Sequence, residues 1–244
     1  MTVYTYSELG NCGRLGNQLW QIAWQVGQAE ERGNCRASIS GSWSYRKFFE
    51  IPDMYYVPPS QGDDVVDGSG RYFQEIGYWA RAASHVCELF QPSEYLASCM
   101  QEAFGEILQS GRHKTALHVR RGDYLKKSAD HPVLGMDYYC RAIRAVRNVF
   151  PCTEIYVFSD DIAWCKSNFQ GEFMFVDGFL TPQGDPQDIY ELTLMTKMNS
   201  HIIANSSFSW WGARLSSDAA PIYPPIWSPL TRLDKMIPIS WQSV

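Results

Sequence analysis

The chain has 244 residues and a formal net charge of −5, and its hydrophobic and charged fractions, 45% and 19%, are those of an ordinary globular protein. This negative charge argues against sequence-independent binding of nucleic acid, which depends on Lys and Arg side chains that neutralise phosphates. Seven scattered cysteines without a C-x-x-C pair indicate neither a disulfide framework nor a zinc site, and the lack of a signal peptide or membrane-spanning run predicts a cytoplasmic protein.

The first half of the chain opens with the pattern of a β-α unit. A strand is expected near Val3 to Tyr6 and a helix from about Asn17 to Glu31, with a glycine-rich turn between them. The stretch S-Q-G-D-D-V-V-D-G-S-G, from Ser60 to Gly70, is predicted to be a flexible loop because of its composition. A further helix is expected over Pro92 to Leu108, with Ser93 as its cap.

The second half alternates between strand and helix patterns. In order, we expect a strand over 116–119, a helix over 137–150, a strand over 154–160, a helix over 161–169, a strand over 172–177, a helix over 186–198, a strand over 200–205, a helix over 206–217 and a short extended piece over 220–225. This rhythm predicts a parallel, doubly wound sheet. The stretch S-G-R-H-K at 110–114 is the expected boundary between two α/β domains, residues 1–112 and 113–244, with a cleft between them.

Polar side chains follow each predicted strand of the second half. In doubly wound sheets, ligands bind outside the carboxyl ends of the strands. The residues expected at those ends are His118, Arg120, Ser159, Asp160, Asp177, Asn205 and Ser206. Connecting loops without a ligand would not need this pattern, so it predicts a binding site.

The densest cluster is H-V-R-R-G-D-Y, from His118 to Tyr124. The guanidinium group carries a fixed fork of donors that matches phosphate oxygens, and it keeps its charge at working pH. The alternative is an internal salt bridge of Arg120 or Arg121 with Asp123. We expect one arginine to serve this structural purpose and the other to bind an anion.

A second cluster is N-S-S-F-S-W-W-G, from Asn205 to Gly212. Serines at the start of a helix present hydroxyl and backbone N–H groups to an anion, and the helix dipole assists. The alternative is an ordinary serine cap, with Trp210 and Trp211 packed under the sheet. Together with Arg120 on a neighbouring strand end, the segment predicts a two-sided clamp on a phosphate or diphosphate.

The third cluster is F-S-D-D, from Phe158 to Asp161. Its two carboxylates could bind a metal, cap the next helix, or accept hydrogen bonds from a base or ribose, and Asp161 is placed to be a cap. A dedicated metal site would require more carboxylate or histidine ligands nearby than the sequence supplies. Because the G-x-x-x-x-G-K-[ST] loop and a strand-borne G-x-G-x-x-G are both missing, the phosphate site is predicted to consist of arginine and serine.

Five motifs together resemble those of glycosyltransferase family 11. They are G-R-L-G-N-Q-L-W-Q-I-A-W from Gly13, R-Y-F-Q from Arg71, H-V-R-R-G-D-Y-L from His118, F-S-D-D from Phe158, and E-L-T-L-M-T-K-M-N-S-H-I-I-A-N-S-S-F-S-W-W-G-A from Glu191. The resemblance implies a GT-B architecture with two Rossmann-like domains. It also implies an inverting fucosyltransferase without a metal ion or cofactor, which moves fucose from GDP-fucose to a hydroxyl, O2 of a galactose, on a glycan acceptor.

The resemblance further implies roles for single residues. Arg120 would contact the β-phosphate and stabilise charge on departing GDP, while Arg121 would hold the local fold. The first turn would face the cleft, so that Arg14 and Asn17 reach the sugar, the diphosphate or the acceptor. Asn17 and Asp123 join Arg120 as expected catalytic residues. The remaining donor-binding residues would be His118, Asp160, Asp161, Asn205, Ser206, Ser207 and Phe208.

Two alternatives stay open at the level of sequence. The acceptor hydroxyl must lose a proton, and Asp123, Asp130 and His131 are the candidate bases in the loop after the arginines. The donor could also be another GDP-sugar, such as GDP-mannose or GDP-rhamnose. The non-enzymatic alternative is a GDP-binding module of the same fold that does not catalyse a reaction.

Overall fold

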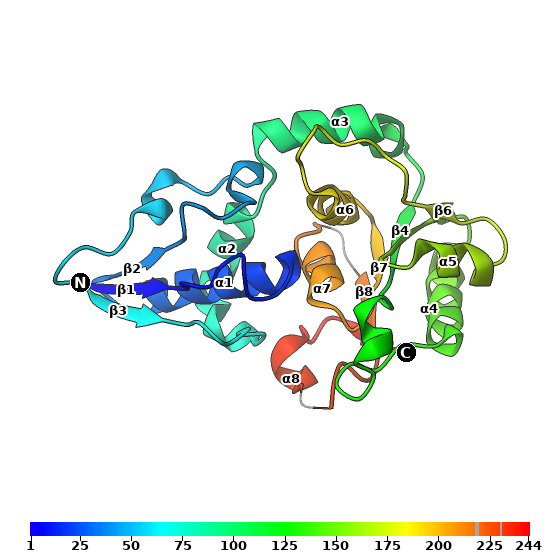
Figure 1. Cartoon of the computed structure of the whole chain (residues 1–244). Coiled ribbons are helices and arrows are strands. Elements are labelled where there is room, and N and C mark those ends of the chain that lie inside the picture. The colour runs from blue at the N-terminus through cyan, green and yellow to red at the C-terminus, as the bar shows by residue number, and fades with distance from the viewer. Residues whose placement is uncertain (218–219, 230) are drawn as a thin grey trace. The chain divides into compact units, whose positions relative to one another are not determined.

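The computed structural model describes residues 1–217, 220–229 and 231–244. The chain divides into two compact units, Met1–Ser98 and Cys99–Val244, each with a parallel sheet of its own (Figure 1). The division lies inside helix α3 (Glu94–Gln109), whereas the composition placed the domain boundary at 110–114.

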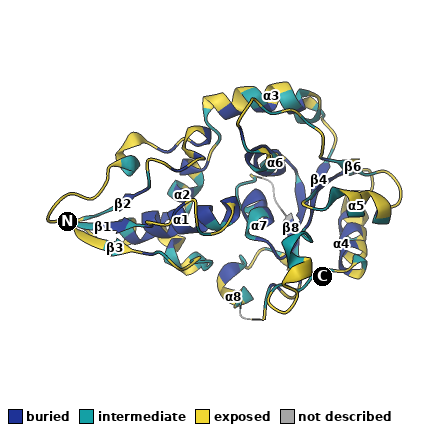
Figure 2. Ribbon diagram, in the orientation of Figure 1, coloured by how far each residue is buried: buried dark blue, intermediate teal, exposed yellow. Residues whose placement is uncertain are grey.

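The sheet of the first unit has the order β2-β1-β3, and all its strands are parallel. Strand β1 (Thr2–Thr5) lies between β2 (Cys35–Ser38) and β3 (Asp64–Asp67). Helix α1 (Leu15–Glu31) follows β1 and is buried along most of its length (Figure 2). The predicted β-α opening is therefore confirmed.

Strand β3 corrects one expectation, because the stretch from Ser60 to Gly70 was predicted to be a loop. Residues Asp64–Asp67 instead pair with the whole of β1, and Asp67 accepts hydrogen bonds from Ser7 N at 3.1 Å and Ser7 Oγ at 2.6 Å. Acidic residues and glycines disfavour strands locally. The extended form here depends on pairing with β1, which is distant in the sequence.

Short helical elements follow in the first unit. They are the 3₁₀ helices η1 (Arg46–Phe48), η2 (Asp53–Tyr56), η3 (Ile76–Tyr78) and η4 (Ala80–Ala82), and helix α2 (Ala83–Leu89). Helix α3 begins as predicted at Ser93, whose Oγ accepts a hydrogen bond from Leu96 N at 3.3 Å. The helix has a kink at Phe104, where φ is −135° and ψ is 20°.

The second unit contains the predicted doubly wound sheet, with the order β6-β5-β4-β7-β8-β9 and parallel pairing throughout. Its strands are β4 (Lys114–Val119), β5 (Glu154–Ser159), β6 (Met174–Phe175), β7 (Ser200–Ile202), β8 (Ala220–Tyr223) and β9 (Gln242–Ser243). Strands β5 and β6 extend the sheet on one side of β4, and β7, β8 and β9 extend it on the other side. The order reverses between β4 and β7, and ligands bind such sheets outside the carboxyl ends of the strands at this position.

Helices cover both faces of this sheet. Helices α4 (Met136–Val149) and α5 (Ile162–Asn168) lie on one face, and α6 (Gln187–Thr196) and α7 (Ser207–Arg214) lie on the other (Figure 1). The 3₁₀ helix η5 (Asp123–Lys126) follows β4, and α8 (Leu233–Met236) precedes β9. Helices α6 and α7 pack closely, since a Cβ on Gly212 would lie 2.7 Å from Met195 Sδ.

The core of the second unit lies between the sheet and its helices. Leu117 and Val119 of β4 are fully buried with Tyr139 of α4 and Val157 of β5. Trp210 and Trp211 of α7 are fully buried as well. The alternative interpretation of the second cluster, in which these two tryptophans are packing residues, therefore holds for them. The strands whose carboxyl ends carry the polar residues thus pack against buried side chains of the helices.

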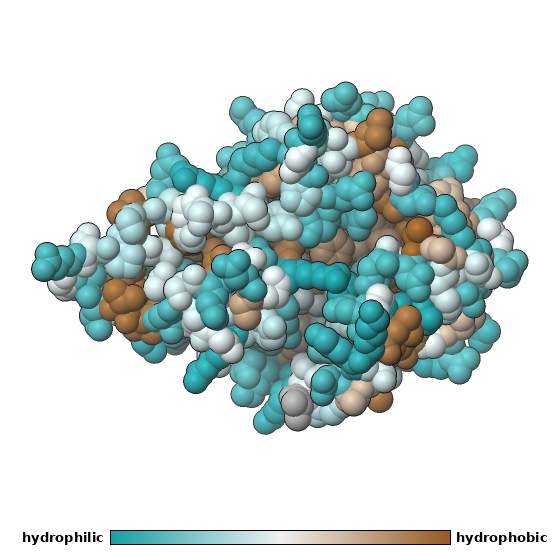
Figure 3. Space-filling model, viewed as in Figure 1, coloured by the Kyte–Doolittle hydropathy of each residue, from teal (hydrophilic) through white to brown (hydrophobic). Residues whose placement is uncertain are grey.

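The face shown in Figure 3 is largely hydrophilic, with hydrophobic side chains in small groups. Among the residues that the structure describes, no helix has both the length and the apolar character needed to cross a membrane.

Candidate active site

The first arginine of the H-V-R-R-G-D-Y cluster follows directly after β4 and lies between two carboxylates. Arg120 Nη2 lies 2.5 Å from Asp123 Oδ1, and Nη1 lies 2.9 Å from Asp160 Oδ2. The side chain is 13% exposed, and its Nε is buried without a hydrogen-bond partner among the described residues. The guanidinium is therefore fixed after the end of β4, and its Nε–H has no acceptor among the described residues.

The second arginine also follows β4, and it contacts the turn after β5. Arg121 Nε lies 3.3 Å from Asp161 Oδ2, and its guanidinium carbon lies 4.0 Å from the centre of the Trp164 ring. Its backbone N–H donates to Asp160 Oδ1 at 2.9 Å. Arg121 thus makes contacts within the protein. The salt bridge between Arg120 and Asp123, which the sequence left open as the alternative to a binding site, is also present.

The two aspartates of F-S-D-D have different contacts. Asp161 caps α5, because its Oδ1 accepts a hydrogen bond from Trp164 N at 3.3 Å. Asp160 joins the two arginines through the Arg120 side chain and the Arg121 backbone. Both carboxylates are therefore engaged within the protein.

His118 is buried in β4 beneath these charges. Burial, followed by the charge of Arg120, lowers its pKa to about 3, so the imidazole is neutral at physiological pH. Its Nδ1 is buried and makes no hydrogen bond within the described chain, and its ring centre lies 5.5 Å from that of Phe208 in α7. A neutral His118 contributes an uncharged ring and not a cation to the site.

Asn205, which follows β7, holds two neighbouring loops together. Its Nδ2 donates to Pro132 O at 2.8 Å and to Trp227 O at 2.9 Å, and its backbone carbonyl accepts from Tyr124 Oη at 2.9 Å. Its Oδ1 is buried without a partner in the described residues. The segments after β4 and after β8 are therefore fixed to the end of β7.

Helix α7 begins one residue later. Ser206 is extended, with φ −139° and ψ 128°, and its side chain makes no capping hydrogen bond to α7. The helix starts at the carboxyl end of β7, next to β4, and the contact between Phe208 and His118 joins it to β4. Ser206 and the partly buried Ser207 and Phe208 thus lie at the start of α7, beyond the carboxyl end of the strand that pairs with β4.

One further acid was missed from the sequence. Glu191 lies in the first half of α6, which enters from the same edge of the sheet, and its pKa is raised to about 7 by burial and by the charges of Asp188 and Asp160. Shifted carboxyls of this kind gather at functional sites. The sequence pattern that could have revealed Glu191 is an acidic residue between Tyr190 and Leu192, which are both buried. From the sequence, this segment was interpreted only as a helix.

The candidate bases in the loop after Arg120 differ in their surroundings. Asp123 is the partner of Arg120, whereas His131 stacks on Tyr124 with ring centres 4.6 Å apart. Asp130 is exposed. The described part of the chain contains no group of three or more His, Cys, Asp or Glu side chains that could hold a metal ion.

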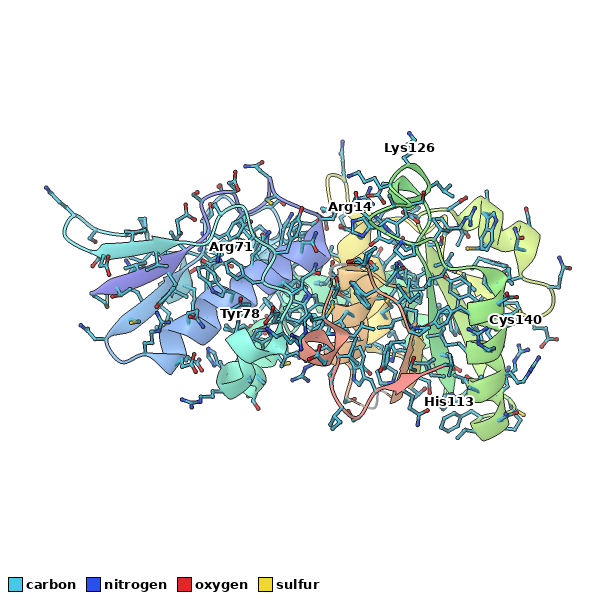
Figure 4. The ribbon with its side chains drawn as sticks, turned by 90° about the horizontal axis from the view of Figure 1, so that it is seen from below. Arg14, Arg71, Tyr78, His113, Lys126 and Cys140 are labelled. Atoms are coloured by element: carbon cyan, nitrogen blue, oxygen red, sulfur yellow. The ribbon has the colours of Figure 1, made fainter. Side chains whose placement is uncertain are left out.

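Arg14 and Asn17 belong to the first unit, so the structure does not group them with the cluster around Arg120. Arg14 (Figure 4) stands at the cap position of α1 without a capping bond from its side chain. Asn17 lies in the first turn of the helix. Their predicted contacts with the substrates stay predictions.

Comparison with known proteins assigns a family to this arrangement. Residues 68–233 match the model described as Glycosyl transferase family 11. The chain belongs to this family. One Escherichia coli relative, the O-antigen biosynthesis glycosyltransferase WbnK, is 32% identical over 70% of this chain and 58% of its own length. Another E. coli relative, an alpha-1,2-colitosyltransferase, is 35% identical over 60% of this chain and 50% of its own length.

A mouse relative, galactoside 2-alpha-L-fucosyltransferase Sec1, is 30% identical over 41% of this chain and 28% of its own length. The chain thus spans about half the length, or less, of these curated relatives.

The fold has a counterpart among solved structures. The Bradyrhizobium fucosyltransferase NodZ superposes with a TM-score of 0.56 at 13% identity, over 88% of this chain and 92% of the NodZ chain. This likeness confirms the predicted fold class, α/β of the GT-B type with two parallel sheets.

Proposed function

We propose that this chain is an inverting fucosyltransferase that moves fucose from GDP-fucose to a hydroxyl, O2 of a galactose, on a glycan acceptor. Membership of family 11 and the name of the mouse relative support the donor and the galactoside acceptor. The observation that carries the proposal is that Arg120 after β4 and the start of α7 after β7 follow two adjacent strands, where the strand order reverses. Such a position binds nucleotides in doubly wound sheets.

The chemical step breaks the bond between the anomeric carbon and the β-phosphate oxygen of the donor. The electron pair leaves with GDP, and the acceptor oxygen forms the new bond on the opposite face of the sugar and loses its proton. Negative charge therefore grows on the diphosphate, where a guanidinium and the N–H groups that begin α7 would stabilise it.

In the proposed complex, the diphosphate displaces one of the two carboxylates that Arg120 holds. Asp123 is 38% exposed, whereas Asp160 is 20% exposed and also accepts from Arg121 N, so Asp123 is the partner that the diphosphate displaces. The exchange would leave the Asp123 carboxylate next to the reacting groups. This places Asp123 ahead of Asp130 and His131 as the base that accepts the proton.

Glu191 is the carboxylate that we propose for recognition of guanine. Guanine presents N1–H and N2–H₂ side by side, and a carboxylate offers two acceptor oxygens with matching spacing. Asp160 and Asp161, the carboxylates expected near the nucleoside, are engaged with the two arginines and with α5. Glu191 lies close enough to Asp160 for the charge of Asp160 to raise its pKa, which supports a position beside the same site.

A second candidate donor follows from one comparison. The E. coli alpha-1,2-colitosyltransferase is 35% identical, and its name specifies a sugar other than fucose. The phosphate and guanine contacts proposed above would serve any GDP-sugar, so they do not distinguish the two donors.

We also propose that the protein works in the cytoplasm. All seven cysteines lie in the described part of the chain, and none forms a disulfide bond. Reduced cysteines are usual in that compartment.

Calorimetric titration of the protein with GDP, GDP-fucose, GDP-mannose and UDP, without added metal, tests the nucleotide class. Binding of GDP and GDP-fucose but not UDP is the expected result, and transfer assays with galactosides would follow. If no GDP compound binds, the cluster around Arg120 is only a network of salt bridges and the proposal fails.

A further inference from the structure

The R-Y-F-Q motif contacts the first turn of α1 through one hydrogen bond. Gln74 Nε2 donates to Asn17 Oδ1 at 2.8 Å, although the two residues are 57 positions apart in the sequence. Both belong to the first unit, and the bond is partly buried. Figure 4 labels Arg14 and Arg71, which lie on the two segments that this bond joins.

The backbone beside Gln74 is held in an unusual conformation. Phe73 has a φ of +52°, which bulky side chains rarely adopt. Its ring stacks on Trp24 of α1 at 4.2 Å with an angle of 7° between the ring planes, and it meets Tyr78 edge-on at 5.5 Å. Strained conformations of this kind persist only where the surroundings enforce them, and they cluster at functional positions.

Asn17 is fixed from its other side by a glycine. Gly13 has a φ of +81°, and a Cβ built on it would lie 2.7 Å from Asn17 Nδ2. The space that a side chain would fill is therefore occupied by the nitrogen end of the Asn17 amide. Gln74 holds the oxygen end, and Gly13 accommodates the nitrogen end.

This orientation determines what Asn17 can offer to a substrate. A carboxamide has an acceptor end and a donor end, and Gln74 occupies the acceptor end. The NH₂ group carries two N–H donors, so it can satisfy an acceptor within the protein and still present a donor. We infer that Gln74 is a positioning residue that fixes Asn17 as a hydrogen-bond donor toward an oxygen of the acceptor sugar. The inference rests on the proposed function.

The substitution Gln74→Glu tests this role, because a carboxylate accepts but does not donate. The Asn17 amide would then turn over, donate to the new carboxylate and present its carbonyl oxygen to the substrates. We expect kcat to fall about 100-fold, the effect of losing one such donor, with little change in KM. Gln91→Glu is the matched control, since Gln91 Nε2 donates to Cys87 O at 3.0 Å on the surface of the same unit, and it should leave kcat unchanged.

A double-mutant cycle distinguishes positioning from general support of the fold. If Gln74 acts through Asn17, Gln74→Glu has no further effect on kcat once Asn17 is replaced by alanine. An unchanged kcat in Gln74→Glu, or effects that add fully in the double variant, would overturn the inference. Wild-type turnover with GDP-fucose is measured first, because its absence counts against the proposed function and not against the contact.

The contact itself can be measured without turnover. Hydrogen bonding to the carbonyl strengthens the partial double bond of an amide, so rotation of the Asn17 NH₂ group, followed by ¹⁵N NMR, should be faster in Gln74→Met than in the wild type. Equal rotation rates in the two proteins would overturn the inference whatever the enzyme assays show.

Discussion

Gly122 and Asp160 are so close that no side chain fits between them, because a Cβ built on Gly122 would lie 2.4 Å from Asp160 Oδ2. That same oxygen pairs with Arg120 Nη1 at 2.9 Å, and Asp160 Oδ1 accepts from Arg121 N at 2.9 Å. The glycine in H-V-R-R-G-D-Y is therefore a steric requirement of the contact that orients Arg120.

Substitution of Gly122 by alanine should displace Asp160 and release the arginine. We expect the affinity for GDP to fall about 10-fold and the free energy of unfolding to decrease by about 1–3 kcal/mol, the usual cost of forcing a methyl group into a filled space. Gly135→Ala is the control, because a Cβ there meets nothing within 4 Å. Calorimetric titration and thermal unfolding of both variants check the prediction, and equal behaviour of the two would contradict it.

Replacing Arg120 by alanine should lower kcat by about 100- to 1,000-fold, as expected for loss of a group that stabilises the leaving diphosphate. The substitution also leaves Asp160 without its ion pair, so circular dichroism must show that the fold is retained. Arg112→Ala is the control, since the Arg112 side chain is 74% exposed. Substantial residual turnover of a folded Arg120→Ala variant would remove this residue from the phosphate role.

GDP affinity should depend on pH through Glu191. Its pKa is about 7 in the free protein, and hydrogen bonds from guanine favour the ionised carboxylate, so binding should strengthen as pH rises from about 6 to 8. Glu191→Gln should flatten this dependence. The phosphate of GDP also titrates in this range, but it does so equally with both proteins, and the difference between their titrations isolates Glu191. Parallel pH profiles would refute the assignment.

Through Glu191, a rise in pH should lower the folding stability, although it should strengthen GDP binding. Its pKa rises from 4.5 to about 7 on folding, so the folded state binds the proton more tightly. The stabilisation is complete below about pH 4.5 and is lost as pH rises through 7, and it amounts to at most about 3 kcal/mol. The stability of Glu191→Gln relative to the wild type should therefore increase between pH 4.5 and 7, and urea unfolding at several pH values measures this difference.

A chelator should not reduce turnover. The proposed mechanism stabilises the departing diphosphate with Arg120 and with the N–H groups at the start of α7. Fucose transfer measured with and without EDTA is expected to proceed at the same rate. A loss of activity that Mg²⁺ or Mn²⁺ restores would show that a metal ion takes part.

The sequence alone predicted the second half of the chain well, because the evidence there is local. Alternating strand and helix periods identified every strand and α-helix from β4 to β8, although not the 3₁₀ helix η5, and polar residues at the strand ends indicated the edge where Arg120 and Ser206 lie. The cap of α5 by Asp161 was also anticipated, since a cap and its helix are neighbours in sequence.

Only the tertiary structure decided the features that depend on distant partners. Strand β3 exists because it pairs with β1, and its composition indicates a loop. The sequence suggested Asp123 as the partner of one arginine, but it did not show that Asp160 bridges the two arginines. It also did not show that burial raises the pKa of Glu191. The bond between Gln74 and Asn17 spans 57 residues, and such contacts leave no periodic trace in the chain because packing alone brings them together.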